Sequence, residues 1–399
     1  MLEIETNLTD QERAVRDAAH KFAVEVMRPA GQELDRLADP ADVIAKDSIL
    51  WDVFAKHRAA GLGDLEAAGA GLTPLERTRM RVLVAEEMGW GDSGLAISLG
   101  VANFHKTFAM MSRQPALIER YCRPDSHDVG CWAVTEPDHG SDSLTVTEKH
   151  FSDPAIKANC IARKDGDFYV INGQKSAWVS NGTIATVAAL FCTIDGDEGF
   201  KGGGVAVVDL TLPGVTKGKP LNKLGQRALN QGEIFFDNVR IPAAYMAVGK
   251  DRYAAIVESI LTGANASMGT TFVGVARAAY EMALDYAKQR VQGGVPIIEH
   301  QSVRSRLFKM FTQVEAARSL VRRVSYYNAT NPPLIQYSIA SKTFATNTAF
   351  EVSSAALQIF GGVGLTKEFP IEKLMRDARA SMIEDGCNEL LGLVGGSRL

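Results

Sequence analysis

The sequence ALQIFGGVGLTKEFPIEKLMRDAR, residues 356–379, joins two predicted helices through a glycine-rich segment. The first helix is expected over about 335–359 and to end at Gly361 and Gly362, because glycine often follows the last turn of a helix. The second is expected to begin at about Ile371. Since no predicted strand precedes the glycines, they do not form a dinucleotide-binding fingerprint. They either cap the helix or let a ligand approach the backbone closely.

Helical patterns extend from this segment towards the N-terminus. A further helix, ended by Asn331-Pro332-Pro333, is predicted by apolar residues spaced three or four apart. Helices are also predicted over the first ~125 residues, where Thr9 or Asp10 suits a helix N-cap. The apolar segment 95–111 is expected to form one buried helix. The apolar stripe before the prolines consists of Leu307, Met310, Phe311, Val314, Ala317 and Val321.

Between these helical regions the composition changes to short runs rich in β-branched and aromatic residues, separated by Gly, Asp and Asn. Such runs predict an antiparallel β-domain. The predicted strands are FYVING (168–173), VAALFCTI (187–194), GVAVVDL (204–210) and GEIFFDNVRIP (232–242). The sequence therefore predicts three domains: helices over 1–128, a β-domain over 129–245, and a helical bundle over 246–399.

The composition excludes several classes of function. The 399 residues include 43 basic and 47 acidic side chains, interleaved for a net charge of −4, so no nucleic-acid partner is expected. The N-terminus is charged from residue 3 and no apolar window reaches the length of a membrane span, so neither a signal peptide nor a span is predicted. Five widely spaced cysteines without a CxxC pair favour a reduced, cytoplasmic protein. The seven histidines do not cluster, so no metal site is expected.

Two polar segments of the predicted β-domain are candidates for ligand binding. AVTEPDHGSDSL, residues 133–144, offers hydroxyls and backbone N–H groups that suit a polar ring edge or a phosphate, although an ordinary polar turn is the alternative. INGQKSAWVSNG, residues 171–182, contains Asn172-Gly173, a hairpin signal. Trp178 would then lie on the following strand, and its simplest role is that of a core residue.

A third candidate lies between two helices of the bundle. In RVQGGVPIIEHQSVRSRL, residues 290–307, Arg290 ends one helix and His300-Gln301 begin the next, after a glycine loop. A helix N-terminus with polar side chains suits an anion. The alternative is an ordinary helix–helix connector.

The order and spacing of these four segments resemble the acyl-CoA dehydrogenases, and LGQRALNQGEIFFDNVRIP, residues 224–242, adds to the likeness. The resemblance runs from the N-terminal helices to about residue 390. It implies an α+β multidomain fold with an N-terminal all-α domain, a central antiparallel β-barrel-like domain and a C-terminal four-helix bundle. It also implies non-covalent FAD, a homotetramer, α,β-dehydrogenation of acyl-CoA thioesters, and an electron-transferring flavoprotein as electron acceptor.

The resemblance assigns cofactor contacts to particular positions. Ser141 also matches a serine near the CoA portion of the ligand, and Arg290 matches an arginine that binds the FAD pyrophosphate of a neighbouring subunit. Around Arg290, Gly293-Gly294 stand where the family usually has an aromatic residue before glycine. The Trp178 segment is one residue longer than the commonest form. The implied FAD contacts are Trp132, Val134, Thr135, Gly140, Ser141, Trp178, Val179, Ser180, Arg290, His300, Gln301, Gln358, Ile359, Gly361 and Gly362.

The segment SMIEDGCNEL, residues 381–390, contains the expected catalytic carboxylate. The family base is usually a glutamate before glycine, and counting from EKLMRDAR places it on Asp385, with Gly386 following. Glu384 is the competitor because its side chain is longer, and the alternative is that both carboxylates only decorate a helix N-terminus. A minority of the family uses a base on an earlier helix, but Ala264 and Asn265 occupy those positions. Ser141, Asn265 and Gly386 are expected to contact the substrate.

Aspartate at this position changes the expected chemistry. Its side chain is one methylene, about 1.5 Å, shorter than glutamate, and a misplacement of about 1 Å can cost about a hundredfold in rate. We expect an FAD-dependent acyl-CoA dehydrogenase for an unusual, for example cyclic or branched, thioester. The alternatives are an oxidase, monooxygenase or non-oxidative lyase of the same fold, or a non-catalytic partner subunit. The acyl group, the base, the electron acceptor, and a homo- or hetero-oligomer stay open.

Overall fold

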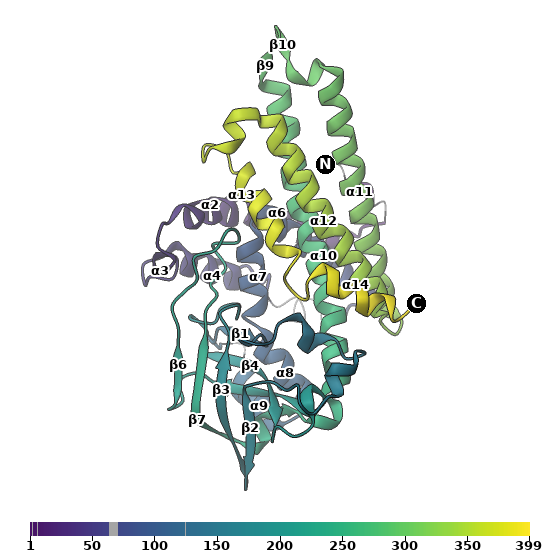
Figure 1. Ribbon diagram of the computed structural model, residues 1–399. Coiled ribbons are helices and arrows are strands. Elements are labelled where there is room, and N and C mark those ends of the chain that lie inside the picture. Colours follow the sequence, from purple (N-terminus) through teal and green to yellow (C-terminus); the bar gives the residue numbers. More distant parts are fainter. Residues whose placement is uncertain (2, 6, 64–70, 124) are drawn as a thin grey trace.

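The computed structural model describes residues 1, 3–5, 7–63, 71–123 and 125–399. Figure 1 shows a helical N-terminal region, a sheet at one end of the molecule and long helices that extend away from it. The N-terminal elements are α1 (Asp10–Phe22), the π-helical η1 (Ala23–Met27), α2 (Arg28–Arg36), α3 (Pro40–Val43), α4 (Ile49–Ala59), α6 (Pro74–Gly91), α7 (Ser93–Val101), α8 (Phe104–Ser112) and α9 (Pro115–Tyr121).

One prediction for these helices is confirmed and another is wrong. Thr9 caps α1 through a hydrogen bond from the Glu12 N–H to its hydroxyl, and the Glu12 side chain accepts from the Thr9 N–H, so the predicted cap is confirmed. The prediction of one helix over 95–111 is wrong, because α7 and α8 are separate. The Ala102 carbonyl accepts a hydrogen bond from the N–H of Gly130, at 2.9 Å, instead of continuing the helix.

The central sheet is mixed rather than purely antiparallel. Strand order is β6-β7-β3-β2-β4-β5-β8, and β1 and β2 both pair in parallel with β4, along different parts of its length. All other pairings in this sheet are antiparallel. The strands are β1 (Gly130–Ala133), β2 (Ile161–Asp165), β3 (Phe168–Lys175), β4 (Val187–Ile194), β5 (Gly203–Asp209), β6 (Val215–Lys217), β7 (Ile234–Pro242) and β8 (Met246–Val248). Their shared core is mostly aliphatic, with three buried cysteines and Phe236.

The predicted hairpin at Asn172-Gly173 is wrong. Both residues lie inside β3, where its register with β7 shifts between Ile171 and Gly173. Gly173 has φ of 134°, and a Cβ there would lie 2.5 Å from the Cys160 Cα. The glycine therefore allows a β-bulge close to the neighbouring Cys160 backbone, and it does not form a turn.

The C-terminal region is a bundle built around α10 (Lys250–Gln289), which has 40 residues. It packs against α6, α11 (Gln301–Thr330), α12 (Ile335–Phe360) and α13 (Ile371–Ser381), and α14 (Asn388–Gly396) follows. A short hairpin, β9 (Val291–Gln292) and β10 (Val295–Pro296), lies at the end of the bundle that is remote from the sheet (Figure 1). The domain boundaries at 128 and 245 stay predictions, and the sheet extends past the second because its strand β8 begins at Met246. No helix in the described part of the chain is long and apolar enough to cross a membrane.

Glycines let α6 and α10 approach closely, and this contact attaches the N-terminal helices to the bundle. A Cβ on Gly89 of α6 would lie 1.9 Å from the Thr271 carbonyl oxygen of α10. A Cβ on Gly274 of α10 would lie 2.1 Å from the Glu86 carbonyl oxygen of α6. Beside this crossing, the buried Glu86 carboxylate accepts hydrogen bonds from Arg277 of α10 and from Arg318 and Arg322 of α11.

The Gly274→Ala variant should therefore destabilise the protein by about 1–3 kcal/mol, because the added methyl group forces the two helices apart. Gly263→Ala on the same helix is the matched control, since a Cβ there meets nothing within 4 Å. The control should be neutral or up to about 1 kcal/mol more stable, from helix propensity alone. Thermal or denaturant unfolding of both variants measures this, and equal stabilities would contradict the close crossing.

Candidate active site

The loop between α13 and α14 contains the two candidate carboxylates. Glu384 and Asp385 lie in its turn rather than at a helix start, so the expectation of a helix N-terminus is wrong. Asp385 has φ of 52° and Gly386 has φ of 88°. A left-handed aspartate is uncommon and persists where its surroundings hold it.

Three side chains from different parts of the chain hold this loop. The fully buried Lys342 of α12 donates from its Nζ to the Gly386 carbonyl oxygen, at 2.9 Å, and to Asn388 Oδ1, at 2.8 Å. Asn265 of α10 donates from Nδ2 to the Asp385 carbonyl oxygen, at 3.4 Å. The N–H of Cys387 donates to Ser141 Oγ, at 3.1 Å. The loop is thereby attached to the bundle and to the segment that follows β1.

The two carboxylates have different surroundings. Glu384 Oε2 accepts a hydrogen bond from Gln226 Nε2, at 2.8 Å, and Lys223 adds a nearby positive charge. The Asp385 carboxylate accepts no hydrogen bond from any described residue, and the charge of Lys342 is its main electrostatic partner. The Asp385 carboxylate is thus free of hydrogen bonds to described residues, whereas Glu384 is held by the Gln226 side chain.

Burial affects the ionisation of all three groups around the loop. It raises the pKa of Asp385 to about 6, against the lowering effect of Lys342. It raises the pKa of Glu384 to about 7, although the Gln226 hydrogen bond and Lys223 oppose it. It lowers the pKa of Lys342 to about 8, against the raising effect of Asp385 and Glu384. A carboxylate with a raised pKa is a better base near neutral pH than a solvated one.

Several polar atoms beside the loop have no partner within the described chain. The backbone N–H groups of Asp385 and Gly386 donate to no described acceptor. Asn265 is fully buried, and its Oδ1 has no hydrogen-bond partner there. Buried polar groups are normally paired, so unpaired ones mark places where a ligand or water completes the structure.

The β-domain places the predicted flavin-contacting segments next to one another. The Ser180 backbone pairs with the backbones of Trp132 and Gln231 through single β-bridges. The Ser176 N–H donates to the Thr135 carbonyl oxygen, at 2.8 Å. The Thr135 hydroxyl makes no hydrogen bond to a described residue, and the buried Trp132 Nε1 has no partner among them either. Because Ser141 contacts the Cys387 N–H, these segments and the carboxylate loop form one site, here called the ring site.

The other predicted positions near the ring site differ in how far their side chains are exposed to solvent. The Trp178 side chain is 57% exposed, so the interpretation of Trp178 as a core residue is wrong. Val179 is buried in the β-domain core, which leaves only its backbone for a ligand. Val134 is partly buried against the neighbouring apolar cluster, and Gly140 is exposed. The contacts of all these residues with a cofactor stay predictions.

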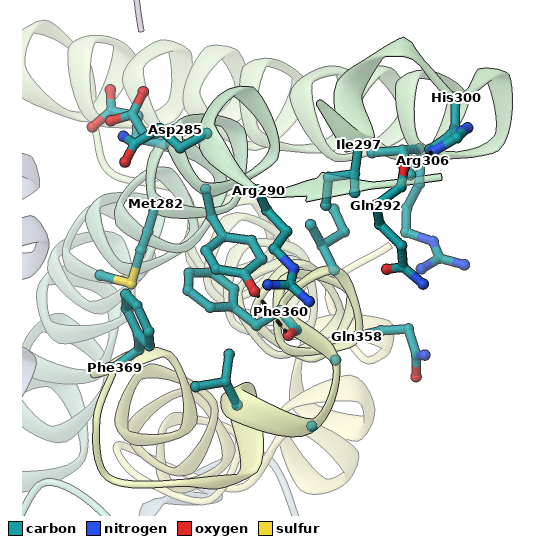
Figure 2. A pocket seen from close by; sticks show the side chains of 18 of the residues that line it. Met282, Asp285, Arg290, Gln292, Ile297, His300, Arg306, Gln358, Phe360 and Phe369 are labelled. Carbon is teal, nitrogen blue, oxygen red and sulfur yellow. Dashed lines mark hydrogen bonds between the residues drawn. The ribbon is translucent and has the colours of Figure 1, made fainter. Parts of the chain in front are cut away.

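The second group of predicted positions lies elsewhere, around a cavity of about 1370 Å³ at the remote end of the bundle. We call it the bundle-end cleft. The C-terminal end of α10, the loop after it, the start of α11 and the end of α12 form its walls. Figure 2 shows Arg290, Arg306 and Gln358 extending into the same hollow. The predicted residues that line it are Arg290, His300, Gln358, Ile359, Gly361 and Gly362.

The bundle-end cleft has the properties of an anion site. The guanidinium groups of Arg290 and Arg306 make no hydrogen bond, ion pair or ring contact with a described residue. Gly361 and Gly362 face open space, since a Cβ on either would meet nothing within 4 Å. Two uncommitted cations beside an open glycine backbone suit a phosphate or pyrophosphate.

Part of this cleft was not anticipated from sequence. Gln301 begins α11 as expected, but it does not line the cavity. Arg306 was missed, although it stands one helical turn after Ser302, which also lines the cleft. An aromatic cluster was missed too: Tyr286 and Phe360 stack with ring centroids 4.1 Å apart, and Phe369 lies 5.1 Å from Phe360. Arg306 follows Ser302 by four residues and Val303 by three, so helical spacing links it to other residues of the cleft, whereas nothing local predicted the aromatic cluster.

The ring site and the bundle-end cleft are far apart within one chain. Asn265 contacts the carboxylate loop, and Gln289 at the end of the same helix lines the cleft. Twenty-four residues separate them, which is about 36 Å of α-helix. Figure 1 shows the sheet and the β9–β10 hairpin at opposite ends of the molecule. The short ribityl chain between a flavin ring and its pyrophosphate cannot cover this distance.

Comparisons with known proteins agree on one family. The acyl-CoA dehydrogenase middle-domain model matches residues 131–239, and the acyl-CoA dehydrogenase C-terminal-domain model matches residues 254–399. The cyclohex-1-ene-1-carbonyl-CoA dehydrogenase of Geobacter metallireducens is 30% identical over 400 residues, covering 98% of this chain and 99% of the relative.

Solved structures give the same result. The butyryl-CoA dehydrogenase of Megasphaera elsdenii superposes with a TM-score of 0.86 and 28% identity, over 99% of both chains. A chain in a structure described as the electron transferring flavoprotein of Acidaminococcus fermentans superposes with a TM-score of 0.85 and 27% identity, over 98% of both chains.

The bundle-end cleft generates a prediction about cofactor affinity. Arg290→Ala should weaken FAD binding about 10- to 150-fold, because a charge-assisted contact to a phosphate contributes about 1.5–3 kcal/mol. The control is Arg304→Ala, which removes an exposed cation of α11 that does not line the cleft. Titration of the apoprotein with FAD measures both affinities. Equal affinities would make Arg290 only a cation at a helix end.

Proposed function

This chain belongs to the acyl-CoA dehydrogenase family, and we propose that it desaturates an acyl-CoA thioester with Asp385 as the base. The observation that carries the proposal is the contrast between the two loop carboxylates. Asp385 is partly buried, is free of hydrogen bonds within the described chain and has a pKa raised to about 6, whereas Glu384 is held by Gln226. Only Asp385 has both the basicity and the freedom that proton abstraction requires.

FAD is the cofactor of this family, and the side chains around both clusters fit it. The uncommitted Arg290 and Arg306 guanidiniums, with the open backbone at Gly361-Gly362, suit its pyrophosphate. The free Thr135 hydroxyl and the unpaired Trp132 N–H suit a polar ring edge. FAD, when bound, supplies the acceptor for the hydride that leaves the substrate β-carbon.

Because the two clusters cannot reach one cofactor within a single chain, we propose that a second copy of this chain completes the site. The ring site of one copy would bind the flavin ring, while the bundle-end cleft of the other would bind the phosphates. This arrangement requires at least a dimer, and a homotetramer satisfies it.

The chain's own groups perform the proton chemistry. The Asp385 carboxylate takes the proton from the substrate α-carbon, and the electron pair of that C–H bond forms the α,β double bond. The β-hydrogen leaves with its electron pair, so the charges balance. Negative charge develops on the thioester carbonyl oxygen, and the free N–H groups of Asp385 and Gly386 are suited to stabilise it. Lys342 and Asn265 keep the loop in place throughout.

We also propose a cyclic or branched acyl group and an electron-transferring flavoprotein as acceptor. The support for the acyl group is the short aspartate base, which requires an α-carbon placed differently from that of a linear chain. The Geobacter metallireducens relative is a cyclohexene-carbonyl-CoA dehydrogenase, which agrees with this. The support for the acceptor is the likeness to the chain in the Acidaminococcus fermentans structure.

A panel of linear, branched and cyclic acyl-CoA thioesters, scored by bleaching of bound FAD, tests the substrate class. Fastest reduction by a cyclic or branched thioester supports the proposal, and fastest reduction by a linear one contradicts it. Rapid reoxidation of the reduced protein by O2 would instead indicate an oxidase or monooxygenase. A protein that binds FAD but is bleached by no thioester would indicate a non-oxidative or non-catalytic member.

Single substitutions of the two carboxylates test the base. Asp385→Asn should slow flavin reduction by the best substrate by about two orders of magnitude or more, since general-base catalysis contributes about 10²–10⁴-fold. Glu384→Gln removes a carboxylate of the same loop and should change the rate only modestly. Stopped-flow single-turnover rates, with FAD content checked, decide between them. The reverse ranking would assign the base to Glu384.

The pH dependence of the same rate tests the role of Lys342. Only ionised Asp385 can take a proton, so the rate should rise with pH through about 6. Removing the Lys342 charge leaves burial unopposed and raises the Asp385 pKa. Lys342→Met should therefore move the midpoint upward by about one pH unit, while Lys342→Arg should leave it near the wild-type position. Glu384, Cys387 and Glu389 remain unchanged around the loop, so an unmoved midpoint in Lys342→Met would exclude this role.

A further inference from the structure

A chain of hydrogen bonds leads from a cation to the ring site. Lys223 donates from Nζ to the Leu229 carbonyl oxygen, at 2.8 Å, and to Gln231 Oε1, at 2.9 Å. Gln231 donates from Nε2 to the Trp178 carbonyl oxygen, at 3.2 Å, and to Ser180 Oγ, at 3.3 Å. Gln231 is buried, with 6% of its surface exposed, so this geometry does not depend on a mobile surface side chain.

The direction of every hydrogen bond in this chain is fixed by chemistry. An ammonium group can only donate, so the oxygen of the Gln231 amide must face Lys223. Its NH2 group must then face Ser180, and the Ser180 oxygen must accept. The hydroxyl hydrogen of Ser180 therefore points away from Gln231. No described residue accepts that hydrogen, although Ser180 lies in the site where a ring is expected.

We propose that Gln231 is a positioning residue that directs the Ser180 hydroxyl hydrogen to the flavin ring of FAD. This inference rests on the proposed function, because it requires the ring to lie beside Ser180. Lys223 contributes indirectly by fixing the orientation of the Gln231 amide. Gln231 and Lys223 do not touch the ring, and they act through Ser180.

The expected effect is on the reduction potential. Two-electron reduction adds electron density to the ring, and a hydrogen-bond donor stabilises the form with more electron density. A committed Ser180 donor therefore raises the potential of bound FAD. If the Ser180 hydrogen were free to turn towards another acceptor, the potential would fall and the visible absorption bands of the oxidised cofactor would shift.

The test uses Gln231→Glu in the FAD-loaded protein without substrate. Glutamate keeps the size of the side chain and the partner of Lys223, but it turns the donor that faces Ser180 into an acceptor. The Ser180 hydrogen should then move to residue 231, and the reduction potential should fall with a change in the visible spectrum. Ser180→Ala should shift the potential in the same direction, because it removes the donor outright.

A double-mutant comparison separates the hydroxyl effect from the added charge. The drop in potential caused by Gln231→Glu should be clearly smaller when Ser180 is already alanine. Asn230→Asp is the control, since it adds the same charge one residue away, where the side chain contacts Thr183 instead. Its shift should be the same with and without Ser180.

Two outcomes would overturn the inference. If Gln231→Glu shifts the reduction potential equally with Ser180 and with Ser180→Ala, its effect is due to the added charge alone. If Gln231→Glu leaves the potential unchanged, Gln231 does not act on Ser180. The uncharged Gln231→Met serves if the glutamate variant folds poorly, with the same dependence on Ser180 expected. A protein that binds no FAD would refute the proposed function instead, so the two failures can be told apart.

Discussion

Helix α10 continues without a break from Lys250 to Gln289, and both functional clusters are placed by it. Asn265, inside this helix, contacts the carboxylate loop, while Gln289 at its end lines the bundle-end cleft. A continuous helix cannot bend two distant clusters together, so the separation of about 36 Å is a fixed property of the chain. The close crossing of α6 at Gly89 and Gly274 holds the N-terminal helices against the same scaffold. The sharing of one FAD by the two clusters, as proposed above, therefore requires a second copy of the chain.

The proposed chemistry depends on charges that are placed where water is scarce. Burial raises the Asp385 pKa to about 6, and the buried Lys342 keeps it from rising further. The same ammonium also anchors the Gly386 carbonyl oxygen, so one side chain determines both the position and the charge state of the proposed base. Glu384, one residue away, is tied to Gln226 instead. Adjacent carboxylates of similar chemistry thus have different surroundings, and the roles proposed for them differ for that reason.

Much of the fold could be predicted from sequence, because local signals and structure agreed. The Thr9 cap, the strand Val187–Ile194 and the helix ending before Gly361 follow from composition and spacing. The prediction failed where a distant segment overrode a local signal, as at Asn172-Gly173, whose glycine avoids the Cys160 backbone. The resemblance brought together the segments that meet at the ring site, and their contacts with a cofactor stay predictions. The charge interaction between Asp385 and Lys342 and the hydrogen bond between Glu384 and Gln226 could not be predicted, because sequence does not show which distant residues meet.

We propose that one FAD is held by two chains, with its ring in one and its phosphates in the other. Native mass spectrometry of the FAD-loaded protein, under conditions that gradually separate its chains, tests this most directly. The account predicts that FAD stays with assemblies of two or more chains and that separated, still folded single chains carry none. Folded single chains that each retain one FAD would contradict it, because no single chain could then need a partner's cleft.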